Sequence, residues 1–223
     1  FFLFLIVLSI PSLFDYSKFA KKIEKQVESD FGLSFSNISN IKYRFLPSPH
    51  LVIENLDLSL DLDESSVIAS PENSKLYIPF LKLYNKNVLI NKIVMKDVNF
   101  NFNKSTLNLF LNHLMNEENK ELVVKKSKFF YTNTKNQVST IAVLKNLTYF
   151  SNFKSNQKKL KILGDLFDTD FNFTWNMALD KTHLTSFNLK FKKPNLSIEN
   201  KLDNSNKKKK FGSLKTNFLN YKI

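Results

Sequence analysis

Strict alternation of apolar and polar residues is the feature that most constrains how this 223-residue chain folds. It recurs in residues 56–63, 98–103, 171–176 and 187–192, as in Phe171, Phe173 and Trp175 between polar neighbours. A period of two gives a β-strand one apolar and one polar face. Helices between the strands are scarce, which disfavours a parallel α/β fold. The pattern therefore predicts a mainly β protein with a long antiparallel sheet.

Two helices are expected beside these strands. Residues 16–31 place Ile23, Val27 and Phe31 at helical spacing, and Gly32 is a suitable stop. This amphipathic helix fits a membrane surface or, more commonly, the end of a sheet. Residues 107–115 predict a short inserted helix, with Ser105 as its cap. The low-complexity stretches 151–161 and 201–210 are expected to be solvated loops.

The first fourteen residues carry no charge and read FFLFLIVLSIPSLF. As a helix they would span about 21 Å, less than the roughly 30 Å hydrocarbon core of a bilayer. We interpret them as the end of a longer transmembrane anchor; a signal-peptide core is the alternative. The expected organisation is an anchor at 1–14, a helix at 15–32 and a β-rich domain at 33–223. The predicted anchor residues are Phe1, Phe2, Leu3, Phe4, Leu5, Ile6, Val7 and Leu8.

Residues able to carry chemistry are sparse. Cysteine is absent, glycine occurs three times, and the three histidines are far apart, which disfavours thiol, phosphate-loop and metal sites. Asp57, Asp61 and Asp63 alternate with leucines, as on the solvated face of a strand. We therefore predict no catalytic, metal or cofactor-binding residues, and no enzyme activity.

The net charge of +13 comes almost entirely from lysine, because Arg44 is the only arginine. Nucleic-acid sites usually use arginine for bidentate contacts. The lysines are also spread along the whole chain. We therefore predict no nucleic-acid partner, and a lysine-rich surface with some attraction for anionic membranes.

The order of three segments resembles the amino-terminal region of AsmA-family proteins of Gram-negative bacteria. IEKQVESDFGLSF, residues 23–35, resembles the short helix that ends at a TGL turn, with Gly32 and Leu33 retained. FLPSPHLVIENLDLSL, residues 45–60, resembles the following P-x-L-x-I-x-N-L-x-L strand. Residues 76–102 resemble the hairpin that comes next in the family, and the matching positions are Leu81, Leu83, Val88, Ile90 and Ile93. The resemblance covers about the first 100 residues, and we interpret the chain as an amino-terminal fragment.

The resemblance implies an inner-membrane protein with one anchor and its bulk in the periplasm. Such proteins are related to bridge-like lipid transfer proteins and are implicated in moving phospholipid toward the outer membrane and in outer-membrane assembly. The implied partners are membrane phospholipid, the inner membrane and outer-membrane assembly proteins. The implied fold is an open, curled β-groove with an apolar interior. The candidate lining residues are Leu56, Leu58, Leu60, Val98, Phe100, Phe102, Phe171, Phe173, Trp175, Phe187, Leu189 and Phe191.

The alternation by itself leaves a second fold open. Two sheets whose apolar faces cover each other produce the same pattern, and closed cores are the norm. The corresponding function is a membrane-anchored β-sandwich module that binds a protein or an envelope polymer. A groove would leave a contiguous apolar surface exposed, whereas a sandwich would not.

Overall fold

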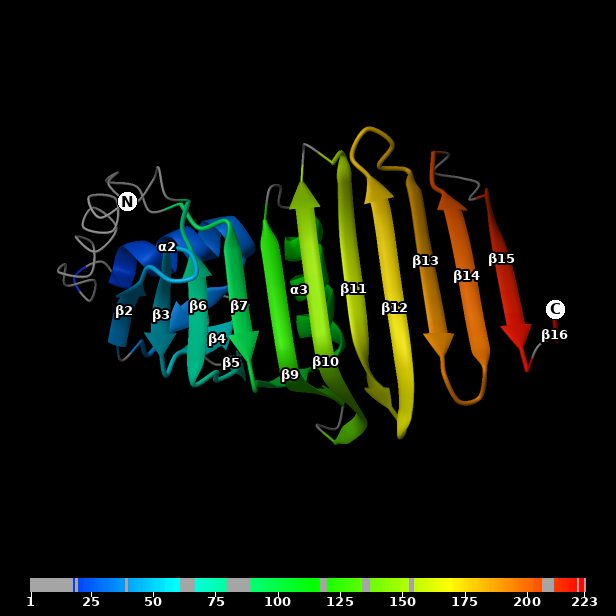
Figure 1. Ribbon diagram of the computed structural model, residues 1–223, viewed down its shortest axis with the longest axis horizontal. Helices are drawn as coiled ribbons and strands as arrows, with labels where there is room; N and C mark the ends of the chain where they lie inside the picture. Colours follow the sequence, from blue (N-terminus) through cyan, green and yellow to red (C-terminus); the bar gives the residue numbers. More distant parts are fainter. Residues whose placement is uncertain are drawn as a thin grey trace.

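The computed structural model describes residues 18, 20–38, 40–60, 67–79, 89–116, 120–133, 137–152, 155–205, 211–219 and 221–222. In this part of the chain the fold is mainly β, with a large curled sheet, a small sheet and two helices (Figure 1). The helices are α2 (Ala20–Phe31) and α3 (Lys104–Asn116). The small sheet contains β1 (Ser34–Ser36), β4 (Asp57–Ser59) and β5 (Val67–Ala69).

The large sheet has the strand order β16-β15-β14-β13-β12-β11-β10-β9-β7-β6-β3-β2, and β8 also pairs with β9. Its first strands are β2 (Asn40–Arg44), β3 (His50–Glu54), β6 (Asn73–Tyr77), β7 (Lys92–Lys96) and β8 (Asn99–Phe102). The later strands are β9 (Glu121–Thr132), β10 (Val138–Asn152), β11 (Gln157–Leu166), β12 (Thr169–Ala178), β13 (Leu184–Phe191), β14 (Leu196–Asp203), β15 (Phe211–Phe218) and β16 (Tyr221–Lys222).

The sheet is mixed, which corrects the expectation of a purely antiparallel one. Strands β7 and β8 pair in parallel with opposite ends of β9, whereas the other strand pairs are antiparallel. The reason is α3, which connects β8 to β9 and returns the chain to the end of the sheet from which β7 started. Parallel neighbours require such a crossover, whereas antiparallel neighbours need only a hairpin.

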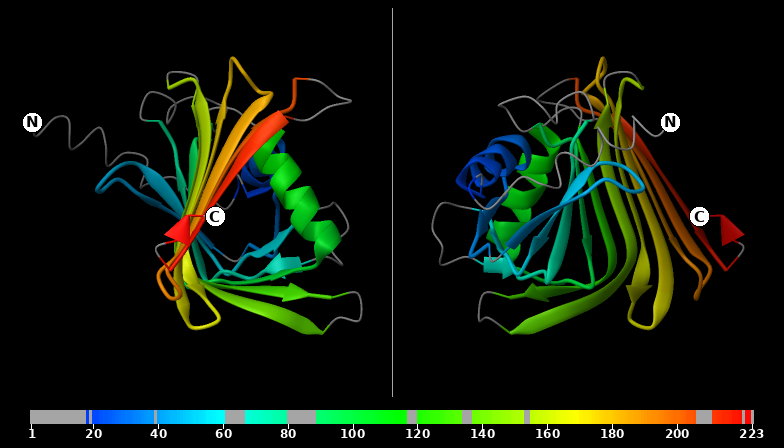
Figure 2. Two further views of the ribbon diagram at one scale, coloured as in Figure 1. Left: turned by 90° about the vertical axis from the view of Figure 1, so that its right-hand side faces the viewer. Right: turned by 60° about the vertical axis from the view of Figure 1, so that its left-hand side comes forward.

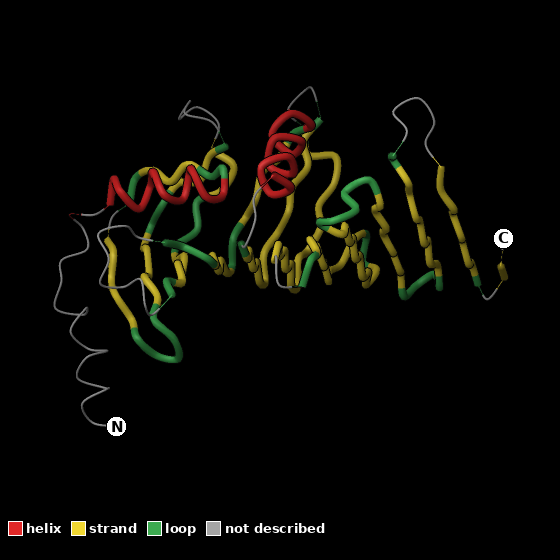
Figure 3. The backbone as a smooth tube through the Cα atoms, turned by 90° about the horizontal axis from the view of Figure 1, so that it is seen from above, coloured by secondary structure: helices red, strands yellow, loops and turns green. Residues whose placement is uncertain are grey.

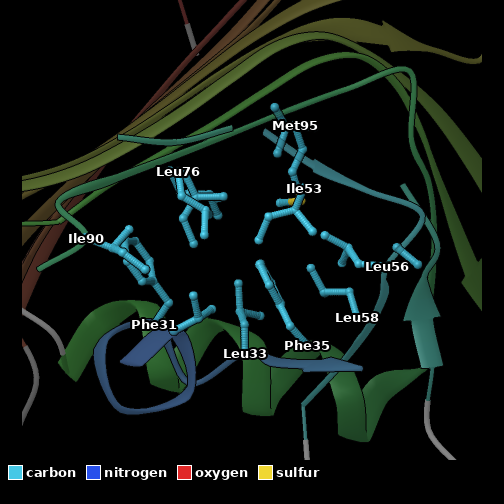
Figure 4. Packing of buried hydrophobic residues seen from close by; sticks show 14 of the residues in the cluster. Phe31, Leu33, Phe35, Ile53, Leu56, Leu58, Leu76, Ile90 and Met95 are labelled. Carbon is cyan, nitrogen blue, oxygen red and sulfur yellow. The ribbon is translucent and has the colours of Figure 1, made fainter. Parts of the chain in front are cut away.

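Both helices lie on the same face of the large sheet (Figures 2 and 3). Helix α2 buries Ile23, Val27 and Phe31, and its core includes side chains from the small sheet and from β3, β6 and β7. Figure 4 shows Phe31, Leu33 and Phe35 opposite Ile53 and Leu76, all of them buried. The amino-terminal half of the sheet is therefore covered by a second layer and closes around an ordinary core.

A buried ion pair ties α2 to the start of β9. The Nζ atom of Lys120 lies 2.8 Å from Oδ1 of Asp30, and both side chains are nearly buried, at 10% and 13% exposure. Gln26 donates a hydrogen bond to the other carboxylate oxygen of Asp30. The Lys120 ammonium also lies 5.3 Å from the ring centroid of Phe31. These contacts fix the end of the helix over the sheet.

Both helices stop close to where the sequence predicts, at Phe31 and Asn116. Gly32 ends α2 at φ 60°, a conformation that glycine adopts at low cost, so the predicted stop is confirmed. The cap of α3 is Asn103 rather than Ser105. The Thr106 amide donates to Asn103 Oδ1 and the Asn103 amide donates to Thr106 Oγ1, both at 2.9 Å.

Both predicted loops, 151–161 and 201–210, are wrong in part. Residues 151–152 belong to β10 and 157–161 to β11, because Leu160 and Ile162 supply a period of two among the lysines. Residues 201–203 likewise belong to β14, and 206–210 lie outside the described residues. The predicted anchor at 1–14, and Leu81, Leu83 and Val88, are also outside them. Neither described helix is long and apolar enough to cross a bilayer.

Candidate functional site

The register of β10 to β15 aligns apolar side chains in three rows across the face on which α3 lies. Each row continues from strand to strand through directly paired residues. The rows are Tyr149-Leu160-Trp175-Phe187-Asn200-Leu214, Leu147-Ile162-Phe173-Leu189-Ile198-Thr216, and Leu144-Gly164-Phe171-Phe191-Leu196-Phe218. We call the part of these rows on β12 to β15 the apolar strip.

Aromatic rings dominate the strip where β12 meets β13. The rings of Phe173 and Phe187 lie 6.1 Å apart between centroids, and those of Phe171 and Phe191 lie 6.2 Å apart. Gly164 makes room for Phe171, because a Cβ atom there would lie 2.9 Å from its ring. Such close cross-strand aromatic pairs stabilise a sheet that has no second layer above it.

The opposite face of the same strands is polar. Asn172 pairs with Lys190, and Thr174 pairs with Asn188, which donates a hydrogen bond to Glu199. Each of β12 to β15 therefore separates an apolar from a polar surface, as the alternation predicts.

An ion pair marks one corner of this part of the sheet. Lys145 donates to Asp170, and this hydrogen bond is the main reason that the pKa of the Asp170 carboxyl is lowered and the pKa of the Lys145 ammonium is raised. The Lys192 ammonium, 3.9 Å away, lowers the pKa of Asp170 further. Both shifts favour the charged forms of these groups. Both side chains are exposed to water, outside the apolar strip.

Exposure rises toward the carboxyl-terminal strands in the first and third rows, whereas the second row is half-buried throughout. In the first row Tyr149 is buried, Leu160 is 9% exposed, Trp175 and Phe187 are half-buried, and Leu214 is 64% exposed. Among the described residues no helix covers β13 to β15 (Figures 1 and 3). The apolar strip is therefore a mainly apolar surface, interrupted by Asn200 and Thr216 and partly open to solvent, which is unusual for a folded domain.

A cavity of about 380 Å³ lies between α3 and the sheet, next to the strip. Its walls come from α3 and from β8 to β12, and its lining side chains are all apolar. They are Phe100, Phe102, Leu107, Phe110, Leu111, Leu114, Val124, Phe129, Ala142, Leu144, Leu147, Leu160, Ile162, Phe171, Phe173 and Trp175. We call this space the α3 cavity.

The position of α3 over this cavity is fixed at both ends. The reciprocal hydrogen bonds of Asn103 and Thr106 start the helix next to β8. In its last turn the carbonyl of Leu114 accepts a hydrogen bond from the hydroxyl of buried Tyr149 on β10. Leu107, Phe110, Leu111 and Leu114 repeat at helical spacing, so one face of α3 points at the sheet.

The twelve predicted lining residues fall into three groups. Phe100, Phe102, Phe171, Phe173 and Trp175 line the α3 cavity. The second group belongs to the apolar strip and pairs with the three β12 residues of the first group; it consists of Phe187, Leu189 and Phe191. The structure places the remaining four in the closed core, away from the cavity and the strip: Leu56, Leu58, Leu60 and Val98.

Several residues of this surface are missing from the sequence-based set. Leu196 and Ile198 on β14 extend the strip, as do Leu214 and Phe218 on β15. Their period of two is present in the sequence, but Asn200 and Thr216 interrupt it. The helix residues Phe110 and Leu111 line the cavity because α3 crosses the sheet, which no local pattern shows.

The histidines belong to other environments. His50 is buried, its Nδ1 lies 2.7 Å from the Ser48 carbonyl oxygen, and its ring stacks on Tyr77. Among the described residues no group of three or more histidine or acidic side chains could hold a metal ion.

A comparison with models of known protein families and with curated proteins finds no match for this chain.

Proposed function

We propose that this protein binds the acyl chains of membrane phospholipids on its apolar strip and in the α3 cavity. The observation that carries the proposal is the continuity of three apolar rows from a covered cavity to an exposed sheet face. A soluble domain gains nothing from leaving such a surface in water, whereas hydrocarbon tails would cover it.

The energetics favour a carrier of this shape. Moving a two-chain lipid from a bilayer into water costs on the order of 20 kcal/mol, at about 0.8 kcal/mol for each CH₂ group. An apolar surface several strands wide removes much of that cost. Side chains such as Phe173, Phe187 and Leu189 offer contact area without hydrogen bonds that would select one lipid.

The resemblance to AsmA-family proteins extends this proposal. In that setting the chain is anchored in the inner membrane of a Gram-negative bacterium, with its bulk in the periplasm. The curled sheet then acts as an open β-groove that takes part in phospholipid transport toward the outer membrane. Outer-membrane assembly proteins are the further partners proposed, and no enzyme activity or nucleic-acid partner is proposed.

The test is lipid co-purification with the full chain, measured by mass spectrometry after extraction. Phe173→Asp and Leu189→Asp each place a charge in the middle of the strip, and we expect either change to reduce bound phospholipid at least tenfold. Asn172→Asp is the matched control, because it adds the same charge on the adjacent residue of β12 but on the polar face. Wild-type protein without phospholipid, or equal loss in the control, would contradict the proposal.

The same experiment separates the alternative function. A membrane-anchored module that binds a protein or an envelope polymer would use the closed amino-terminal half or the polar face. It would retain its partner in the Phe173→Asp variant and would carry no stoichiometric lipid.

A further inference from the structure

We propose that the α3 cavity is a blind pocket that takes the methyl end of one acyl chain, while the rest of the lipid lies on the apolar strip. This inference rests on the proposed function and adds the direction in which a lipid enters. It follows from the closure, chemistry and size of the cavity.

The cavity is closed toward the amino-terminal half by an aromatic wall. The ring of Phe102 lies 5.3 Å from that of Phe110 and 5.2 Å from that of Phe129, and Phe100 stacks on Phe102 at 6.0 Å. Phe100 and Phe102 are 3% and 2% exposed. Behind this wall lies the closed core around Met95. A chain lying in the cavity therefore cannot continue toward β7.

The chemistry of the lining selects hydrocarbon. Every lining side chain is apolar, so a peptide segment would bury its amides without hydrogen-bond partners, at a cost of several kcal/mol for each group. A phosphate or glycerol group would face the same penalty. The methyl end of an acyl chain has no polar atom and can enter the cavity without this penalty.

The volume limits the occupant to one chain. A cavity of about 150 Å³ holds one benzene molecule, so a cavity of about 380 Å³ has room for about 15 carbon atoms. This corresponds to one acyl chain of ordinary length and not to two. The second chain of a phospholipid must then lie elsewhere.

The open side of the cavity faces the strip. Phe171, Phe173 and Trp175 line the cavity and remain half-buried, and they pair directly with Phe191, Leu189 and Phe187. Because Leu214 and Phe218 on β15 are exposed, the polar end of a lipid can reach water in that direction.

Photo-crosslinking of the full chain tests the direction. The probes are two phosphatidylethanolamines that carry a diazirine on one chain, either at its methyl end or next to the glycerol. We expect the methyl-end probe to label peptides containing Phe102, Phe110 or Phe129, and the glycerol-end probe to label β13 to β15. Labelling of β13 to β15 by both probes would overturn the blind pocket but leave lipid binding intact. Absence of any specific labelling would overturn both proposals.

A cavity-filling variant tests the size. Ala142 on β10 lines the cavity beside Phe129, its direct partner on β9, so Ala142→Phe reduces the length of the cavity. We expect the affinity for a 16-carbon fatty acid to fall about tenfold, because leaving about two of its methylene groups in water already costs that much binding free energy. The affinity for a 10-carbon fatty acid, which still fits, should be unchanged. Thr174→Phe, on the polar face of β12, is the matched control and should change neither. Equal losses for both chain lengths, in a variant with a wild-type melting temperature, would overturn the inference.

Discussion

The two halves of the large sheet use the same alternation of residues but bury it differently. The strands β2 to β7 are covered by α2 and the small sheet, and Leu51, Ile53, Leu76 and Ile93 are fully buried there. The strands β13 to β15 have no such cover among the described residues, and their apolar rows stay half-buried or exposed. Whether an amphipathic strand forms a core or an open surface is decided by what is packed against it.

The two halves also differ in side-chain type. The closed core is rich in branched aliphatic residues, which interdigitate at high density. The open strip has aromatic residues at its centre, such as Phe173 and Phe187. Flat rings stabilise each other across neighbouring strands and so need less support from a second layer. This difference suits a surface that is covered only when a ligand is present.

The largest expected difference between the halves is in the free energy of unfolding that is lost when one leucine is truncated to alanine. Leu51→Ala removes a fully buried side chain and should lower the free energy of unfolding by about 2–5 kcal/mol. Leu189→Ala, on the half-buried strip, should lower it by about 1 kcal/mol. Urea denaturation followed by circular dichroism measures both. Equal losses would show that the strip is covered in the free protein.

The second largest expected effect concerns helix α2, which covers the amino-terminal half of the sheet. Asp30→Ala leaves the nearly buried Lys120 ammonium without its carboxylate and should cost about 3 kcal/mol, because α2 loses its tie to β9. The double variant Asp30→Ala/Lys120→Met removes both charges and should recover most of the loss. Urea denaturation of the three proteins provides the comparison. A double variant as unstable as the single one would show that the unpaired Lys120 charge is not the cause of the loss.

The smallest expected effect is a pH dependence in the closed half. Hydrogen bonds from Ser70 and Asn37, the first being the stronger influence, lower the pKa of Asp57 on β4. Its pKa is therefore lower in the folded than in the unfolded protein, so its contribution is complete above the unfolded pKa, near 3.8, and is lost as the pH falls through the lower folded value.

Asp57→Asn should remove this contribution. We expect the variant to be slightly less stable than the wild type at pH 7, and the difference to vanish at acid pH. Thermal unfolding at a series of pH values measures it. Because Asp57 is only partly buried, a difference larger than that of Asp30→Ala would contradict this account.

Much of this fold can be predicted from local patterns. The alternation at 171–176 and 187–192 identifies β12 and β13, and Gly32 marks the end of α2. Which apolar faces are covered could not be predicted, because Leu58 and Phe173 carry the same local signal. Only the packing of α2 and the small sheet distinguishes them. The parallel pairing of β9 was also missed, since it depends on the path of α3.

The candidate site was predicted in part for the same reason. Phe171, Phe173 and Trp175 were identified by alternation and do line the cavity. Phe110 and Ala142 were missed, because a helix residue and a small residue enter the lining only through tertiary packing.

The strand order from β11 to β15 has a mechanical consequence. Each of these strands is hydrogen-bonded only to its neighbours in the sequence, so the loss of one strand's pairing disturbs its direct neighbours first. Fraying of β15 would leave β11 and β12 in place. Local opening in this part of the sheet can thus occur without melting the rest of the molecule.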